Sequence, residues 1–166
     1  MSLKLLGNQL QHTRQNLAQL VREIGALLEQ DPGAKGLQGV QEFGPKTSAV
    51  LRAELGDVKR FARCDQAIAY AGLDISVKES GKWRGQRKLS KRGSGRLRRI
   101  LYLAAIRCVR LTESAFGAYY QRLVARGMKR CVALIAVMRK MLAVAYHLLK
   151  TQEPFDPSKV GLADGN

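Results

Sequence analysis

Apolar residues recur at helical spacing through most of this chain, and one internal stretch interrupts that pattern. Residues 95–111, 114–126 and 129–150 each carry apolar side chains along one helical face. Ser94 and Ser114 stand just before the first two of these segments, where an N-cap is expected. Because 46% of the residues are apolar, the chain can bury a real core. The sequence therefore predicts a mostly α, compact helical domain.

The first segment carries a seam of apolar residues at helical or heptad spacing, which stops at Asp31-Pro32-Gly33. The seam consists of Leu10, Leu17, Leu20, Val21, Ile24, Leu27 and Leu28. An isolated helix would leave it uncovered, so it is either an intramolecular hairpin arm or a dimerising coiled coil. We expect a coiled-coil-like helix over residues 1–31 that forms a homo-oligomer, a domain over 32–153, and a disordered polar tail over 154–166.

The interrupting stretch, residues 78–99, is rich in glycine and in positive charge. It holds ten basic residues against one acid, in a chain whose formal net charge is +16. We read it as a loop or short hairpin that becomes a helix after Gly93-Ser94. A solvated surface is the alternative, but so dense a charge favours a phosphate backbone, because each neutralised phosphate releases counterions. A membrane is not expected, because no apolar run reaches the roughly 18 residues of a spanning helix.

Several other kinds of site are not expected. The three cysteines are scattered, without C-x-x-C pairing, and they read as small buried residues in a reducing cytosol. His12 and His147 lie at opposite ends of the chain, without metal-ligand spacing to a cysteine. With no recognisable signal peptide, we expect a cytoplasmic protein with no metal or cofactor in this chain.

Gly44-Pro45-Lys46-Thr47 suggests a phosphate contact. It is not a Walker A loop, because Pro45 displaces Lys46 and no apolar strand precedes it. It is closer to a helix-hairpin-helix, in which a glycine turn and the next helix N-terminus hold a DNA phosphate through Gly44, Lys46 and Thr47. Glu42 takes the place of the first glycine, and a carboxylate there is unfavourable. A turn used only for packing is the alternative.

The basic stretch supplies the remaining candidate contacts. Ser94 as N-cap, the preceding N–H groups and the nearby arginines resemble a phosphate-binding helix start. A merely soluble helix face would not need five basic residues between Lys91 and Arg99. The candidate nucleic-acid-binding residues are Lys82, Arg84, Arg87, Lys88, Lys91, Arg92, Arg96, Arg98 and Arg99.

Ser80 sits among cations in Glu79-Ser80-Gly81. A lone serine is usually a turn residue, but a hydroxyl that attacks a phosphodiester needs its developing oxyanion neutralised, and nearby cations suit that. Nothing local removes the proton, because Glu79 is the one adjacent carboxylate and no histidine is near. Trp83 is either a base-stacking residue or a loop anchor.

A family resemblance emerges from an ordered series of motifs between about Leu37 and Pro157. They are Phe43-Gly44-Pro45-Lys46-Thr47-Ser48-Ala49-Val50-Leu51, Phe61, Ala69-Tyr70-Ala71-Gly72-Leu73, Glu79-Ser80-Gly81, Leu89-Ser90-Lys91-Arg92-Gly93, Leu97-Arg98-Arg99, Val132 to Lys140, and Pro154-Phe155-Asp156. This series resembles the C-terminal transposase domain of the Piv/MooV-type insertion-sequence transposases, recombinases that are guided by a bridge RNA.

The resemblance implies a mechanism. In that family a RuvC-like domain with four magnesium-binding acids precedes a coiled coil and this domain, whose serine nucleophile matches Ser80. It implies strand cleavage and exchange through a phosphoserine link, DNA as a partner, and room for a guide RNA as a second. Since no acidic domain precedes Met1, we expect a fragment that is inactive alone. The rival is a non-catalytic basic nucleic-acid-binding module, and a hydrolase using Ser94 ranks third.

Overall fold

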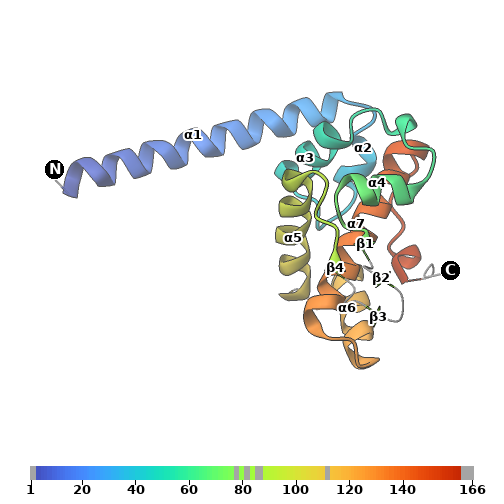
Figure 1. The fold of residues 1–166 in the computed structure, drawn as a ribbon. Coiled ribbons are helices and arrows are strands. Elements are labelled where there is room, and N and C mark those ends of the chain that lie inside the picture. The colour runs from blue at the N-terminus through green and yellow to red at the C-terminus, as the bar shows by residue number, and fades with distance from the viewer. Residues whose placement is uncertain (1–2, 77–78, 81–82, 85–87, 111–112, 162–166) are drawn as a thin grey trace.

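A computed structural model describes residues 3–76, 79–80, 83–84, 88–110 and 113–161, and for residues 75–76, 79–80, 83–84 and 88 we describe the main chain alone. The protein is mostly α, as predicted (Figure 1). Its helices are α1 Leu3–Gln30, α2 Lys35–Gln38, α3 Pro45–Leu55, α4 Cys64–Tyr70, α5 Gly95–Arg110, α6 Ala115–Ala125 and α7 Arg130–Thr151, with short 3₁₀ helices η1 Val58–Arg60 and η2 Pro157–Gly161.

Helix α7 is the centre of the core. It packs against α4, α5 and α6, and residues such as Val137, Met141 and Leu142 are fully buried. The expectation that no apolar run is long enough to span a membrane is wrong for α7, which alone among the described residues is long and apolar enough by length and composition; half of that stretch is buried inside the fold. Its apolar character is therefore that of a core helix enclosed by its neighbours.

The helix boundaries follow local signals. The Ser94 hydroxyl accepts from Leu97 N at 3.1 Å and the Ser114 hydroxyl from Gly117 N at 2.8 Å, so both predicted N-caps are confirmed. At the end of α4, Gly72 has φ +65, and Leu73 N donates to Ile68 O at 3.0 Å, which is a Schellman motif.

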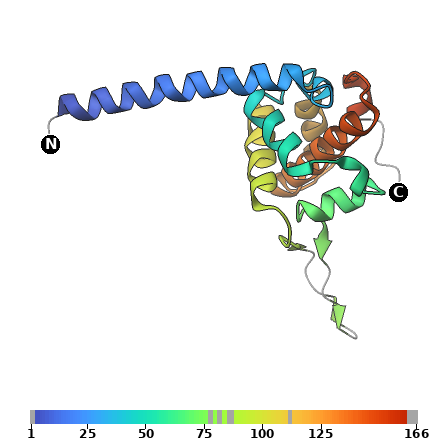
Figure 2. The ribbon, with the colours of Figure 1, turned by 90° about the horizontal axis from the view of Figure 1, so that it is seen from above.

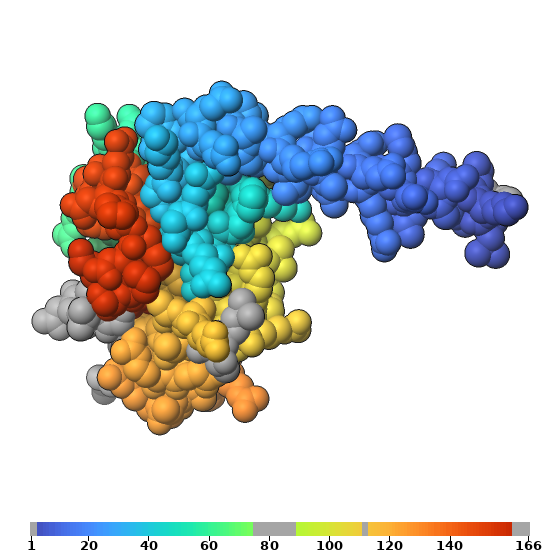
Figure 3. All heavy atoms as spheres, turned by 180° about the vertical axis from the view of Figure 1, so that it is seen from behind, coloured from blue at the N-terminus to red at the C-terminus, as the bar shows by residue number. Residues whose placement is uncertain are grey.

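Helix α1 extends away from the body as an arm (Figures 1 and 3). Its C-terminal end packs on α3, and Leu28 is buried there. The joint is held by Asp31, whose carboxylate accepts from Arg52 Nε at 2.7 Å and from Gly33 N at 2.9 Å. The hydrogen bond from Arg52 is the main reason that the pKa of Asp31 lies below its usual value. The arm therefore leaves the body in a defined direction.

The basic stretch forms a hairpin, one of the two forms expected for it. Strand β1 (Ile75–Ser76) pairs antiparallel with β4 (Lys88–Leu89), and β2 (Glu79–Ser80) pairs antiparallel with β3 (Trp83–Arg84). These strands extend away from the helical body (Figure 2).

Within the tail at residues 154–166, for which we expected disorder, the structure describes residues 154–161 packed on the helical body. The ring of Phe155 stacks on that of Phe116 at 6.3 Å between centroids, and Val160 in η2 is 1% exposed. Two apolar side chains in an otherwise polar segment are enough to fix residues 154–161 on α6. Residues 162–166 lie outside the described part of the chain.

The cysteines predict an order of reactivity. Burial raises the pKa of the Cys108 thiol to about 12, with a further contribution from the negative charge of Glu42, and burial also raises the pKa of half-buried Cys64. Cys131 is exposed. We expect iodoacetamide to label Cys131 first, Cys64 more slowly and Cys108 only after unfolding, as mass spectrometry would show. Equal labelling of Cys108 and Cys131 in the folded protein would contradict this burial pattern.

Candidate nucleic-acid interface

An open groove between α3 and α5 brings together basic residues that lie far apart in the sequence. A cavity of about 330 Å³ is lined by Lys46, Val50, Ala53, Glu54, Arg96, Arg99, Ile100 and Leu103. A second cavity of about 270 Å³ is lined by Val21, Gly44, Pro45, Lys46, Thr47, Ile100, Leu103, Ala104 and Arg107. Because the two cavities share Lys46, Ile100 and Leu103, we treat them as one and call it the α3–α5 groove.

Three of the predicted phosphate-binding residues line this groove with exposed side chains. Lys46 comes from the start of α3, while Arg96 and Arg99 come from the first turns of α5. The Arg96 side chain is 88% exposed, and its Nη1 lies 3.9 Å from the Glu54 carboxylate. An exposed ion pair of this length holds the arginine weakly. Arg96 is therefore available to a ligand in the groove.

Arg107 also lines the groove, although it was not predicted from the sequence to contact phosphate. Its guanidinium lies beside Gly44 and donates to the main-chain oxygen of Glu42. The signal that could have found it is its spacing: Arg96, Leu103 and Arg107 fall along one side of a helix. Residues 78–99 were selected for their density of positive charge, and Arg107 lies beyond them in a later turn of α5.

The turn before α3 has the predicted order of short helix, turn and helix. Gly44 has extended φ −63 and ψ 169 and is the N-cap, and Pro45 occupies the first helical turn. The first amides of a helix have no partner within the helix, and this end of α3 borders the groove. Thr47 is buried, 6% exposed, and lines the groove. Helix-hairpin-helix function stays a prediction.

Glu42 does not face the groove. Its side chain is 4% exposed, and its negative charge acts on the pKa of buried Cys108. The carboxylate that seemed out of place in a phosphate-binding turn is therefore directed into the core and is not among the groove-lining residues.

Arg98 has a different setting from its neighbours. Its Nη1 donates to Ala71 O at 3.0 Å and to Gly93 O at 3.1 Å, and the side chain is partly buried. These bonds tie α5 to the main chain on both sides of the hairpin base. A phosphate contact by Arg98 stays a prediction, but the structure gives this side chain a role in holding the hairpin.

The hairpin base is fixed by a close main-chain crossing. Ser94 N donates to Tyr70 O at 2.8 Å and Lys91 N to Gly72 O at 3.2 Å. A Cβ on Gly93 would lie 2.0 Å from Tyr70 O, so glycine is required at this crossing. Beside it, the Ser90 hydroxyl donates to the Asp74 carboxylate.

Four of the remaining candidate contacts, Lys91, Arg92, Arg84 and Lys88, lie on the hairpin or at its base. Lys91, with φ +54, and Arg92 are exposed at the base. Arg84 and Lys88 belong to β3 and β4, and Lys82 and Arg87 lie outside the described residues.

Ser80 is in β2, and its main chain pairs with Trp83. This pair is the last described one toward the hairpin end, and the strands carry it away from the helical body (Figure 2). The fold thus places the main chain of Ser80 on a projection next to the start of α5.

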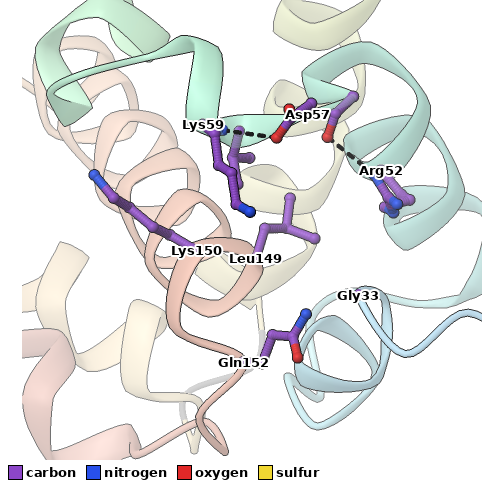
Figure 4. A pocket seen from close by; sticks show the side chains of 9 residues that line it. Gly33, Arg52, Asp57, Lys59, Leu149, Lys150 and Gln152 are labelled. Atoms are coloured by element: carbon purple, nitrogen blue, oxygen red, sulfur yellow. Dashed lines mark hydrogen bonds between the residues drawn. The ribbon is translucent and has the colours of Figure 1, made fainter.

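A further pocket, of about 260 Å³, lies at the ends of α3 and α7 (Figure 4). It is lined by Gly33, Arg52, Gly56, Asp57, Val58, Lys59, Leu149, Lys150 and Gln152. Arg52 Nη1 donates to Gly56 O at 2.9 Å, and Lys150 Nζ donates to Tyr146 Oη at 2.8 Å. Helix C-termini carry partial negative charge and favour cations. Arg52 and Lys150 both lie near helix C-termini, where positive charge is favourable. We therefore assign no anion site to this pocket.

No metal centre emerges from the described part of the chain. Within it, no three histidine, cysteine, aspartate or glutamate side chains gather closely enough to hold a metal ion. The chemistry that the described surface offers is therefore cationic: exposed lysine and arginine side chains line a groove, and Lys91 and Arg92 are exposed at the base of the hairpin.

Comparison with known proteins gives consistent matches. Residues 34–121 match the family described as Transposase IS116/IS110/IS902. The chain is 31% identical over 131 residues to the 43.6 kDa protein of insertion element IS110 from Streptomyces coelicolor, covering 79% of this chain and 32% of that protein. It is 27% identical over 152 residues to the pilin gene-inverting protein of Moraxella bovis, covering 89% of this chain and 47% of that protein. It is 28% identical over 137 residues to the transposase for insertion sequence element IS1111A of Coxiella burnetii, covering 80% of this chain and 37% of that protein. The chain thus spans between a third and a half of the length of these relatives.

Proposed function

This chain belongs to the IS116/IS110/IS902 family of transposases, and from that premise we propose that it is the DNA-binding, serine-bearing part of a recombinase. The observation that carries the proposal is the convergence of Lys46, Arg96 and Arg99 on one groove. Two sequence segments, each predicted separately to contact phosphate, meet there. Since the chain spans under half of its relatives, strand exchange is proposed for it only in combination with the portion that it does not span.

DNA binding is supported by the charge of the groove. Lys46, Arg96, Arg99 and Arg107 line it, against one acid, Glu54. The Glu54 carboxylate accepts from the Ser94 hydroxyl at 2.7 Å and its side chain is 19% exposed. The field at the groove is therefore positive, and a bound strand would release counterions from each neutralised phosphate.

Ser80 is the proposed nucleophile, on the family resemblance. Its hydroxyl oxygen would attack a DNA phosphorus, the bond to the departing sugar oxygen would break, and that oxygen would take a proton. The serine proton must pass to a base, and the energy of the oxyanion must be lowered by cations. The resemblance assigns magnesium-binding acids to a separate domain. The described residues do not supply such a group, so no step of the proposal passes through a metal held by this chain.

A homo-oligomer through α1 is the proposed assembly. Leu3, Leu6, Leu10, Leu17, Leu20 and Leu27 are each about half exposed or more. Their intervals of three, four and seven residues fit the heptad spacing that is typical of a coiled coil. Covering an exposed apolar seam of this length with another helix lowers the free energy of the protein in water. A guide RNA, a second polyanion, is also proposed as a partner on the family resemblance.

The test of DNA binding is the salt dependence of affinity. We expect that replacing Lys46, Arg96 or Arg99 by alanine lowers the slope of log K against log salt by about 0.9 per lost contact to duplex phosphate, or about 0.7 for a single strand. Fluorescence anisotropy with labelled DNA at several salt concentrations measures this slope. Arg126, exposed at the end of α6, is the matched control and should leave it unchanged. Equal slopes in all four variants would show that the groove does not contact phosphate.

A further inference from the structure

The floor of the α3–α5 groove is apolar, which phosphate binding does not require. Leu103 is 52% exposed on this floor, beside half-buried Val50 and the edge of Ile100, which is 9% exposed. Covering such side chains with another apolar surface is favourable, because it removes apolar area from water. A ligand matched to the groove therefore presents both negative charge and an apolar face.

The cations stand around this floor. Lys46 lies on the α3 side, Arg96 and Arg99 on the α5 side, and Arg107 farther along α5. From Arg96 to Arg107 the helix rises about 16 Å. At about 3.4 Å per nucleotide of a stacked strand, that length accepts at most about five nucleotides. The groove is thus a short track, positive at its edges and apolar at its centre.

A duplex does not match this track. Its base faces are stacked inside, and it offers phosphates, sugars and base edges to a protein. The groove lies between two directly packed helices, whose axes are typically 8–10 Å apart. Because each helix is about 10–12 Å wide with its side chains, axes this close leave only a shallow surface groove between them, which a duplex can touch but cannot enter. A duplex could touch the rim but would leave Leu103 uncovered.

An unpaired strand matches both parts of the groove. Its phosphates can meet the basic rim, and its exposed base faces can cover apolar side chains, as in proteins that bind single strands.

A second copy of α1 is the other ligand that the chain itself could offer, and its charge does not match. That helix carries Lys4, Arg14 and Arg22 against Glu23 and Glu29. A weakly basic helix gains nothing from a rim of four cations.

We propose that the α3–α5 groove binds an unpaired nucleic-acid strand, with its phosphates on Lys46, Arg96 and Arg99 and its bases against Leu103, Ile100 and Val50. The inference rests on the proposed function and specifies its ligand. Duplex regions would then contact the hairpin and the rest of the basic surface. The groove would hold a strand that has been separated from its complement.

The experiment compares a labelled 20-nucleotide single strand with a duplex of the same sequence, using the full chain. We expect Leu103→Ser to weaken single-strand binding about fivefold, the equivalent of about 1 kcal/mol, and to change duplex binding less than twofold. Val132→Ser is the matched control, because Val132 is 46% exposed at the start of α7 and should affect neither. Circular dichroism confirms that both variants are folded.

The outcomes separate the two proposals. If Leu103→Ser leaves single-strand binding unchanged, or weakens both ligands equally, the inference is overturned while salt-dependent binding by Lys46, Arg96 and Arg99 still supports the proposed function. If neither ligand binds with a salt-dependent affinity, both fail. In a second measurement, a photoreactive thymine in the single strand should crosslink to residues 100–107. A crosslink confined to other segments would also overturn the inference.

Discussion

Replacing Gly93 by alanine should lower the free energy of unfolding by about 3 kcal/mol or more. The added Cβ would lie 2.0 Å from Tyr70 O and 2.5 Å from Gly72 N. Both atoms are main chain, so no side-chain rotation relieves the overlap. The two segments must separate, and the hydrogen bond from Ser94 N to Tyr70 O is lost with the packing around it.

The measurement is urea unfolding followed by circular dichroism. Gly95→Ala is a matched control two residues away, because the nearest atom to its Cβ is a guanidinium nitrogen of Arg98 at 3.8 Å. Alanine in the first turn of α5 should be neutral or slightly stabilising. If Gly93→Ala and Gly95→Ala proved equally stable, the close crossing at the hairpin base would be wrong.

Replacing Ser80 by alanine should abolish strand exchange, lowering its rate by a factor of about 10³ or more. The assay uses an active recombinase, assembled by supplying this chain with the portion of its relatives that it does not span. A nicked substrate should trap a covalent protein–DNA adduct with the unchanged sequence and none with Ser80→Ala. DNA affinity should stay within about twofold, because one uncharged hydroxyl contributes little beside the basic surface.

Ser76→Ala is the control, because Ser76 belongs to β1 of the same hairpin. It should keep both the adduct and the recombination. Peptide mapping of the adduct to a residue other than Ser80 would reject the assignment. Binding without any adduct would instead support the rival reading, a non-catalytic nucleic-acid-binding module.

The helical core could be predicted because its signals are local. An N-cap such as Ser94 or Ser114 acts on amides three residues away, and an apolar stripe is visible within one helix. The exposed seam of α1 could be predicted for the same reason, because its spacing is visible within one helix. The hairpin was one of two forms expected, because glycine and charge exclude a core segment but do not choose between a loop and paired strands.

The groove itself could not be predicted, because it depends on packing between segments that are distant in the sequence. Charge density identified Arg96 and Arg99, and a turn motif identified Lys46, but only the packing of α3 on α5 shows that they line one surface. Packing between distant segments also explains why Arg98 donates hydrogen bonds to two main-chain oxygens outside its helix, which no local sequence pattern reveals.

The tail shows the opposite error. Its polar composition suggested disorder, yet Phe155 and Val160 suffice to dock it. Composition averages over a segment, whereas docking depends on where individual apolar side chains fall. Arg107 was missed for a related reason, since it lies in the last turn of α5, outside the dense basic stretch at residues 78–99.

The length of the α1 arm would set the distance between two helical bodies joined through it. A helix of 28 residues is about 42 Å long, and the bond between Asp31 and Arg52 joins it to the body without a slack linker. Two bodies joined through such arms would be set apart by a fixed span, so the arm would act as a ruler between their proposed DNA-binding surfaces. Seven added residues would lengthen that ruler by about 10 Å while keeping the seam on nearly the same side.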